Sequence, residues 1–434
     1  MREHVLKRGT HASGAATTAE RIDLMTDKDL PPISPSSRMA RTTRRGFLLM
    51  AGGASLGATL AACSSIQDSP PPSAALPVEP MAPALPANVI GTGTVRIGLI
   101  LPLGASGNAA LAAQSLRNAA ELAMQEFTGA NIQLIVKDDA GTAAGAQAAA
   151  QQALDEGARA IIGPLFSHAV GAAGQVTRGR GVPLVGFSTD TNVATQGVYL
   201  LSFLPETDVE RAVRYAAARG KRAFIAMLPD NAYGSVVEAA FRETVPAAGG
   251  RILGIERYPT NAAGYAEAAR RLTTAAATAD AVFLPDSADV VPQLVQALSA
   301  AGVPMTGKQL IGTGLWDDRK LFAAPALAGG IFAAPDPAGY RGFMERYRAK
   351  FGKEPVRTAT LAHDAVSLMA ALVNSGGEAG LTDAAIQNPS GFSGVDGIFR
   401  FRSDGTNQRG LAIMQIGNGT TTIVDPAPRS FQGM

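Results

Sequence analysis

The chain has 434 residues, of which 48 are Gly and 27 are Pro, and 46% of all residues are hydrophobic while 17% are charged. This composition is typical of a globular protein and excludes a disordered or fibrous one. The first 62 residues hold nine of the 38 basic and five of the 36 acidic residues, so the remainder is faintly acidic and non-specific binding of nucleic-acid phosphates is not expected. One cysteine and four histidines exclude a disulfide framework and a Cys/His zinc cluster. We predict no metal and no cofactor.

An export signal is predicted in the leader, residues 1–62. A basic stretch at Arg41–Leu49 precedes an apolar run that ends at Leu60. The run is too short and too rich in Gly and Ala to span a membrane. The stretch Thr43–Leu48 resembles the twin-arginine export signal, and Met39 would be a more ordinary start for it than Met1.

Cys63 ends the sequence Leu60-Ala-Ala-Cys63, which resembles the bacterial lipobox. The resemblance implies that Cys63 is lipidated and becomes the first mature residue, anchored to a membrane through its acyl chains only. The alternative is a buried structural cysteine. Residues 63–93 then form a Pro-rich linker, which favours polyproline II and acts as a semi-rigid spacer.

From Val95 onward, short β-branched runs alternate with longer amphipathic runs rich in alanine, which is the pattern of βαβ units in a parallel sheet. The first helix is expected over residues 112–127 because apolar residues recur there at three and four spacing. About 340 residues of this pattern exceed one comfortable core, so we predict an α/β fold with two doubly wound parallel-sheet lobes. The expected strands are, in chain order, Val95–Leu101, Ile132–Lys137, Ala160–Gly163, Pro183–Phe187, Val198–Phe203, Arg222–Leu228, Arg251–Arg257, Ala281–Leu284, Gln309–Ile311 and Gly330–Ala333.

Polar side chains follow the ends of these strands in short turns rich in Gly or Pro. Open parallel sheets bind ligands beyond the carboxyl ends of their strands, so these turns predict a site for a small polar molecule. Serine and threonine between a strand and a helix also cap helices whatever the function, and His168 could be solvated or capping instead of binding a ligand. The candidate ligand-binding residues are Ser106, Ser167, His168, Ser188, Thr189, Asp190, Tyr233, Asp286 and Asp289.

These turns resemble those of the type I periplasmic binding proteins, in the Leu/Ile/Val-binding branch that serves ABC transporters. The resemblance covers about residues 94–424 and rests on Ile97-Gly-Leu-Ile-Leu-Pro-Leu103, Ile161-Ile-Gly-Pro164, Pro183-Leu-Val-Gly-Phe-Ser188, Asp230-Asn-Ala-Tyr-Gly234, Asp280-Ala-Val-Phe-Leu284 and Gly397-Ile-Phe-Arg-Phe401. It implies two lobes joined by a three-strand hinge, with crossovers near residues 203–207, 332–337 and 394–399. The implied boundaries are 94–204 plus 336–395 for lobe one, 205–335 plus 396–424 for lobe two, and 425–434 for a tail.

The same resemblance implies a role for individual residues. The position that binds a ligand carboxylate falls near Ser167 or His168, a backbone-carbonyl position falls on Ser188, and Asp286 or Asp289 supplies the lobe-two acid for an ammonium group. Asp190 stands where the family has threonine. An aspartate at this position would repel a ligand carboxylate but attract an ammonium group or a sugar hydroxyl. Tyr233 matches the aromatic residue of the family's D-x-x-Y-G turn. The implied function is non-catalytic binding of a small polar, amino-acid-like ligand or peptide for an ABC permease.

Two alternatives stay open. Gly163-Pro-Leu-Phe-Ser167 and Gly312-Thr-Gly-Leu-Trp-Asp-Asp318 look closer to the envelope lipoproteins of this fold that activate a penicillin-binding protein in peptidoglycan synthesis. Ser64 after Cys63 favours sorting of an exported, periplasmic lipoprotein to the outer membrane. The third interpretation is an enzyme that uses a carboxylate pair such as Asp190 with Asp289, although no Walker A loop, strand-linked G-x-G-x-x-G or H-E-x-x-H motif is present in the sequence.

Overall fold

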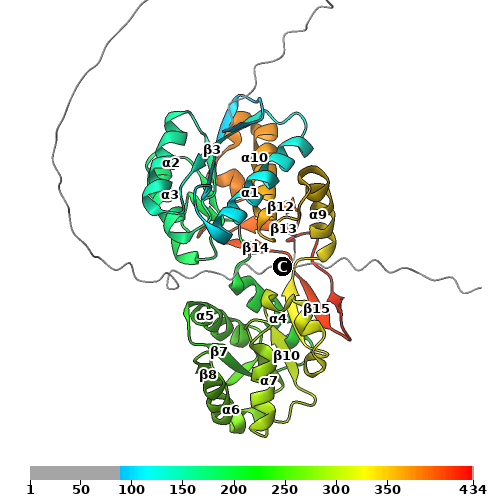
Figure 1. The fold of residues 1–434 in the computed structure, drawn as a ribbon. Helices are drawn as coiled ribbons and strands as arrows, with labels where there is room; N and C mark the ends of the chain where they lie inside the picture. Colours follow the sequence, from blue (N-terminus) through cyan, green and yellow to red (C-terminus); the bar gives the residue numbers. More distant parts are fainter. Residues whose placement is uncertain (1–87, 433–434) are drawn as a thin grey trace, which may run out of the picture. The chain divides into compact units, whose positions relative to one another are not determined.

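A computed structural model describes residues 88–432 (Figure 1). The export signal, Cys63 and most of the Pro-rich linker lie outside the described residues, so their predicted roles remain predictions. The described chain forms two α/β lobes, each built around its own central sheet, as the sequence predicts. Among residues 88–432 no helix is both long enough and apolar enough to cross a bilayer.

Lobe one is a six-stranded sheet in the order β1-β3-β2-β4-β5-β6, parallel except for β1, which pairs antiparallel with β3. Its strands are β1 (Val89–Ile90), β2 (Val95–Leu101), β3 (Ile132–Asp138), β4 (Ala160–Ile162), β5 (Leu184–Gly186) and β6 (Val198–Leu200). Its helices are α1 (Gly107–Glu126), α2 (Ala143–Asp155), α3 (Ser167–Gly179), α9 (Pro337–Phe351), α10 (Ala359–Gly376) and α11 (Asp383–Ile386), with the 3-10 turns η1 (Thr191–Val193) and η4 (Gly377–Gly380).

The sheet of lobe one is covered on both faces, which explains its continuous apolar strands. Leu99 of β2 points into a core shared with α1 and α10, whereas Ile100 points into a second core shared with α2 and α3. In Figure 1 α2 and α3 lie side by side on one side of the sheet, and α1 and α10 lie on the other.

Lobe two is a seven-stranded sheet in the order β16-β15-β11-β10-β9-β7-β8, in which β15 pairs antiparallel with both β11 and β16. Its strands are β7 (Ala223–Pro229), β8 (Arg251–Tyr258), β9 (Ala281–Phe283), β10 (Gln309–Gly312), β11 (Ile331–Ala334), β15 (Ala412–Ile416) and β16 (Thr421–Asp425). Its helices are α4 (Pro205–Ala218), α5 (Ala232–Ala247), α6 (Ala262–Ala277), α7 (Val291–Ala300) and α8 (Arg319–Phe322), with the 3-10 turns η2 (Gly314–Trp316) and η3 (Pro325–Leu327).

The chain crosses between the lobes three times. The first crossover, residues 201–204, joins β6 to α4, and the second, residues 335–336, joins β11 to α9. The resemblance placed them near residues 203–207 and 332–337.

The third crossover lies at residues 410–411, between β14 and β15, and not at the predicted 394–399. Residues 392–409 form an antiparallel sheet of β12 (Phe392–Gly394), β13 (Gly397–Phe401) and β14 (Asn407–Arg409). Phe399 and Phe401 of β13 are buried in the core of lobe one, and the Phe401 ring lies 5.4 Å from that of Tyr199. This aromatic packing keeps the segment in lobe one until Arg409. The predicted start of the last lobe-two segment, residue 396, is therefore too early.

Candidate functional site

The predicted lobe-one residues lie in the turns that follow β2, β4 and β5. Ser106 is exposed at the N-cap position of α1, and its side chain makes no capping hydrogen bond. Ser167 is half-buried at the first residue of α3, and the exposed His168 follows it. The Nε2 atom of His168 lies 3.0 Å from the carbonyl oxygen of Gly141, and its ring stacks on Phe166. The His168 ring is thus held by neighbouring lobe-one turns.

Ser188 and Asp190 are hydrogen-bonded to each other. The backbone N–H of Asp190 donates to Ser188 Oγ at 3.0 Å, and Ser188 is 5% exposed. Asp190 Oδ1 accepts from the backbone N–H and the side-chain amide of Asn192, at 3.1 and 2.8 Å. Asp190 therefore caps η1, and Thr189 is half-buried between the two. This turn is ordered by its own side chains, which fixes where the serine and the carboxylate lie.

Tyr233 lies at the start of α5, directly after β7, and is half-buried. Its hydroxyl is 2.8 Å from Oγ1 of Thr313, which follows β10 and is 1% exposed. Burial raises the pKa of Tyr233, and the charges of Asp208, Asp286 and Glu206 raise it further. Thr313 is a further candidate for the site through this contact, although the sequence drew attention to its turn only as part of the stretch Gly312–Asp318.

Asp286 and Asp289, the alternative lobe-two acids, have different surroundings. Asp286 is half-buried, and its Oδ2 accepts from the hydroxyl of the buried Tyr258 at 2.7 Å. Asp289 is exposed, and its carboxylate forms an ion pair with Lys320 at 2.8 Å. Asp286 is the acid whose charge reaches Tyr233.

Glu206, on the first turn of α4, interacts both with the lobe-one turn that holds Asp190 and with Tyr233 of lobe two. Its Oε1 accepts from the hydroxyl of Thr191, next to Asp190, at 3.2 Å. Burial raises the pKa of Glu206, and the charge of Asp190 adds to this effect. Because the charge of Glu206 also raises the pKa of Tyr233, polar turns of both lobes lie within electrostatic reach of one carboxyl group. Sequence reasoning missed Glu206, since an acidic residue in the first turn of a helix is common for reasons of stability alone.

Asp208, two residues after Glu206 in the same first turn of α4, is also a carboxyl group whose pKa burial raises. Its Oδ2 accepts from the backbone N–H of Gly314, in the turn after β10, at 2.9 Å. Burial raises the pKa of Asp208 to about 7, so its carboxyl group changes charge near neutral pH.

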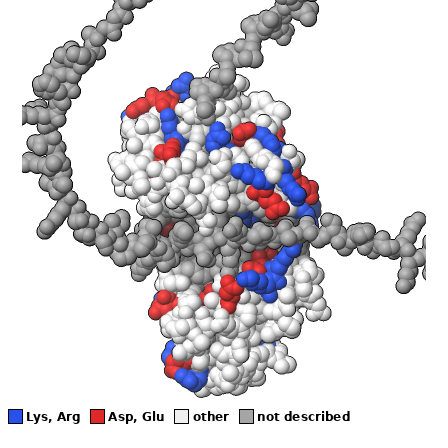
Figure 2. All heavy atoms as spheres, viewed as in Figure 1, with Lys and Arg blue, Asp and Glu red and all other residues white. Residues whose placement is uncertain are grey.

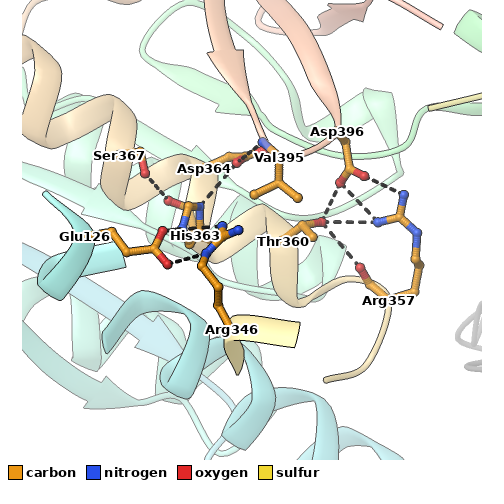
Figure 3. Close-up of polar contacts among 9 residues, drawn as sticks. All are labelled: Glu126, Arg346, Arg357, Thr360, His363, Asp364, Ser367, Val395 and Asp396. Atoms are coloured by element: carbon orange, nitrogen blue, oxygen red, sulfur yellow. Dashed lines mark hydrogen bonds and ion pairs between the residues drawn. The ribbon is translucent and has the colours of Figure 1, made fainter. Parts of the chain in front are cut away.

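Arg357 forms a polar cluster just before α10 that the sequence did not indicate (Figure 3). Its Nη2 and Nη1 donate to the two carboxylate oxygens of Asp396, at 2.6 and 3.1 Å. Thr360 Oγ1 donates to the same carboxylate at 2.6 Å. Burial would raise the pKa of Asp396, but the Arg357 charge and hydrogen bonds outweigh burial and lower it.

His363, also in Figure 3, lies one turn further along α10 between carboxylates. Its Nε2 is 2.9 Å from Glu126 Oε2 at the end of α1, and its Nδ1 is 3.5 Å from Asp364 Oδ1. Arg346 of α9 holds the other oxygen of Glu126 at 2.6 Å. This cluster fastens α1, α9 and α10 to one another and serves the fold of lobe one.

Charged side chains of both signs are scattered over the face that Figure 2 shows, and much of the surface between them carries none. That face has no broad basic patch of the kind that nucleic acids require.

Comparison with known proteins agrees with this architecture. The family model described as "Periplasmic binding protein" matches residues 94–421. No curated protein matches the chain. Among solved structures, a protein described as a branched-chain amino acid ABC transporter from Rhodospirillum rubrum aligns with a TM-score of 0.67 and 20% identity, over 76% of this chain and 99% of that one.

Two further structures give similar results. A branched-chain amino acid ABC transporter periplasmic ligand-binding protein from Burkholderia xenovorans has a TM-score of 0.62 and 18% identity, with 78% and 97% of the two chains covered. An ABC transporter substrate-binding protein from Desulfitobacterium hafniense, in complex with Leu, has a TM-score of 0.57 and 20% identity, with 76% and 99% covered. At these identities the likeness concerns the fold. The family match over residues 94–421, on a fold of two parallel-sheet lobes, shows that this chain belongs to the type I periplasmic binding proteins.

Proposed function

We propose that the protein is an exported solute-binding lipoprotein, which closes its two lobes on a small polar, amino-acid-like ligand and passes it to an ABC permease without chemical change. The observation that carries the proposal is the position of Glu206. This residue bonds to the lobe-one turn that holds Asp190 and acts electrostatically on Tyr233 of lobe two. Polar groups from strand ends of both lobes are thus available to one bound molecule.

In this proposal Ser188 and Tyr233 contact the ligand from opposite lobes. Asp190 and Asp286 provide negative charge for an ammonium or hydroxyl group. Ser106, Ser167, His168, Thr189 and Asp289 complete the proposed set, of which Asp289 has the weakest support because Lys320 already pairs with it at the surface. The Leu bound to the Desulfitobacterium hafniense protein supports an amino-acid-like ligand. Closure can be tight only if each charge that it buries is paired.

Cys63 is proposed as the lipid-anchored first residue of the mature protein, exported to the periplasm and held on the outer membrane. Mass spectrometry of the N-terminal peptide from envelope fractions tests this directly. We expect an acylated Cys63, and a chain that starts elsewhere would contradict the anchor.

Binding is tested first by a thermal-shift screen of the full-length protein against amino acids, short peptides and muropeptides. We expect at least one amino-acid-like compound to raise the melting temperature. Calorimetry with that compound then compares the wild type with Asp190→Ala, for which we expect more than tenfold weaker binding, because about 1.4 kcal/mol of interaction corresponds to a factor of ten.

Asp404→Ala is the matched control. Asp404 is exposed in the β13–β14 turn and accepts from the backbone N–H of Thr406 at 2.8 Å, a local bond like that of Asp190. Its substitution should leave the affinity unchanged. Equal affinities for wild type and Asp190→Ala would remove Asp190 from the site.

The alternative function, activation of a penicillin-binding protein, is favoured by the sequences Gly163–Ser167 and Gly312–Asp318. It predicts co-purification of a penicillin-binding protein from solubilised envelope and no thermal shift with any compound in the screen.

A further inference from the structure

Arg409 is a buried arginine whose hydrogen-bonding capacity is only partly used. It ends β14, directly before the third crossover, and is 3% exposed. Its Nε donates to the carbonyl oxygen of Ser202, in the first crossover, at 2.9 Å. Its Nη1 and Nη2 have no hydrogen-bond partner. Buried charged donors without partners are costly, so a second arrangement that pairs them would be favoured.

A stack of alternating rings and guanidinium groups holds Arg409 and Arg357 on the lobe-one side of the crossovers. Arg357 lies 4.5 Å from the ring centre of Tyr340 and 4.6 Å from that of Phe203. Arg409 lies 4.8 Å from the same Phe203 ring and 5.7 Å from that of Phe399. Cation–π contacts of this kind, together with the Asp396 fork on Arg357, fix both cations in place.

Two carboxyl groups of lobe two lie toward this stack. Phe203 is followed at once by α4, whose first turn carries Asp208. Asp208 accepts from Gly314 N–H, and Asp317 ends the same short turn, so both acids belong to one rigid piece of lobe two. Burial raises the pKa of Asp208, and partial loss of hydration raises that of the surface residue Asp317. The charge of Arg409 lowers the pKa of Asp208, and the charge of Arg357 lowers that of Asp317.

Neither pair is formed in the arrangement described for residues 88–432. No ion pair within 4.0 Å joins Arg409 to Asp208 or Arg357 to Asp317. The side chain of Arg357 is 39% exposed to solvent, and Asp317 is also exposed. Two cations of lobe one thus lie beside the crossover residue Phe203, while the two carboxyls of lobe two lie in the first turn of α4 and in the turn to which Asp208 is bonded.

We propose that lobe closure completes the ion pairs Arg409–Asp208 and Arg357–Asp317, which together act as a latch that holds the closed state. The latch rests on the proposed function in one respect, that the two lobes close. It assigns Asp208 and Asp317 to the conformational equilibrium and not to ligand contact. The buried Arg409–Asp208 pair supplies most of the strength, because the half-exposed Arg357–Asp317 pair is weakened by solvent and salt.

The test measures the distance between the lobes in the full-length protein without any ligand. Cys63→Ser removes the native thiol, and Ala148→Cys in α2 with Thr274→Cys in α6 places nitroxide labels at exposed positions on the two lobes. Pulsed electron paramagnetic resonance then gives the distribution of inter-label distances. In the otherwise unchanged protein we expect a longer and a shorter distance, for the open and closed states.

Asp208→Asn combined with Asp317→Asn should lower the shorter-distance population at least fivefold. Asparagine at position 208 keeps a side-chain oxygen that accepts from Gly314 N–H. If the double variant does not fold, Asp317→Asn alone is measured, and we expect it to lower the shorter-distance population twofold. Sodium chloride at about 1 M, where the Debye length is about 3 Å, should also reduce this population. The control is Asp230→Asn, which removes an exposed lobe-two carboxylate whose partner, Arg257, belongs to the same lobe.

A distribution that neither the substitutions nor salt alters overturns the latch, and so does a gain of the shorter distance in the Asn variants. A failure to find a ligand in the screen above leaves this measurement intact. Conversely, an unchanged distribution together with ligand binding rejects the latch alone.

Discussion

His363 is a buried histidine with a carboxylate on each ring nitrogen. It is 7% exposed and lies between Glu126 of α1 and its own neighbour Asp364, with Arg346 of α9 on the far side of Glu126. Burial alone would lower its pKa, but the hydrogen bonds and charges of Asp364 and Glu126 outweigh burial and raise it above 6.5. The folded state thus favours the protonated imidazole.

This raised pKa makes stability depend on pH. A group whose pKa is higher in the folded state stabilises fully below its unfolded pKa, here near 6.5, and loses that contribution as the pH rises through the folded value. Relative to His363→Gln, the wild type should therefore lose unfolding free energy between slightly acidic and alkaline pH. Urea unfolding of both proteins across that range measures the difference. A constant difference would show that the pKa of His363 is the same in the folded and unfolded states.

At the scale of single residues, the sequence indicated residues that can be recognised from their immediate neighbours in the chain. It did not indicate residues whose hydrogen-bond partners are far away in the sequence. Ser188 and Tyr233 were predicted as site residues because each lies in or next to the turn that follows a strand. Arg357 binds Asp396 across 39 residues, and Arg409 binds the carbonyl of Ser202 across 207 residues. No window of sequence contains both members of such a pair.

At the scale of the elements, the turn after β10 places the indole of Trp316 against the backbone of Gly312. Trp316 is fully buried, and its Nε1 donates to the carbonyl oxygen of Leu284 at 3.0 Å. A Cβ atom on Gly312 would lie 2.1 Å from Cδ2 of the indole. The indole can pack there only because residue 312 has no side chain.

Gly312→Ala should consequently destabilise the protein by about 1–3 kcal/mol, because the indole must move and loses its hydrogen bond. Urea unfolding followed by Trp316 fluorescence provides the measurement. The matched control is Gly179→Ala at the exposed end of α3, where an added Cβ meets nothing within 4 Å and no loss is expected. Equal stability of Gly312→Ala and wild type would refute this account of the turn.

Every strand predicted from Val95 to Ala333 is present, within a few residues at its ends. Most of these strands are buried on both faces and form continuous apolar runs, whereas β8 is a half-buried strand at the sheet edge. The strands that were not predicted are β1 and the five after β11. In β16, Ile423 is 41% exposed, and β13 is held by Phe399 and Phe401 in a core formed by distant segments. Their structure depends on tertiary contacts that a local pattern does not contain.

At the scale of the whole molecule, the two lobes have separate hydrophobic cores. Trp316, the only tryptophan of the chain, lies in a core of lobe two, whereas Leu99 lies in a core of lobe one. Tryptophan fluorescence therefore reports on lobe two, while far-ultraviolet circular dichroism reports on both lobes.

Leu99→Ala should separate these two signals. Removing a fully buried leucine costs about 2–5 kcal/mol, and this loss falls on lobe one. We expect the dichroism midpoint in urea to fall by more than the fluorescence midpoint. If both midpoints fall equally, the crossovers transmit unfolding between the lobes and the molecule is one cooperative unit.

The position of β1 shows which lobe the start of the described chain belongs to. β1 pairs with β3 at the edge of the lobe-one sheet, so the polypeptide before residue 88 enters the molecule through lobe one. Lobe two is joined to that entry point only by the three short connections. If Cys63 is held on a bilayer and the lobes close as proposed, lobe one is the tethered half, and lobe two, on the far side of the hinge, makes the movement that captures or releases a solute.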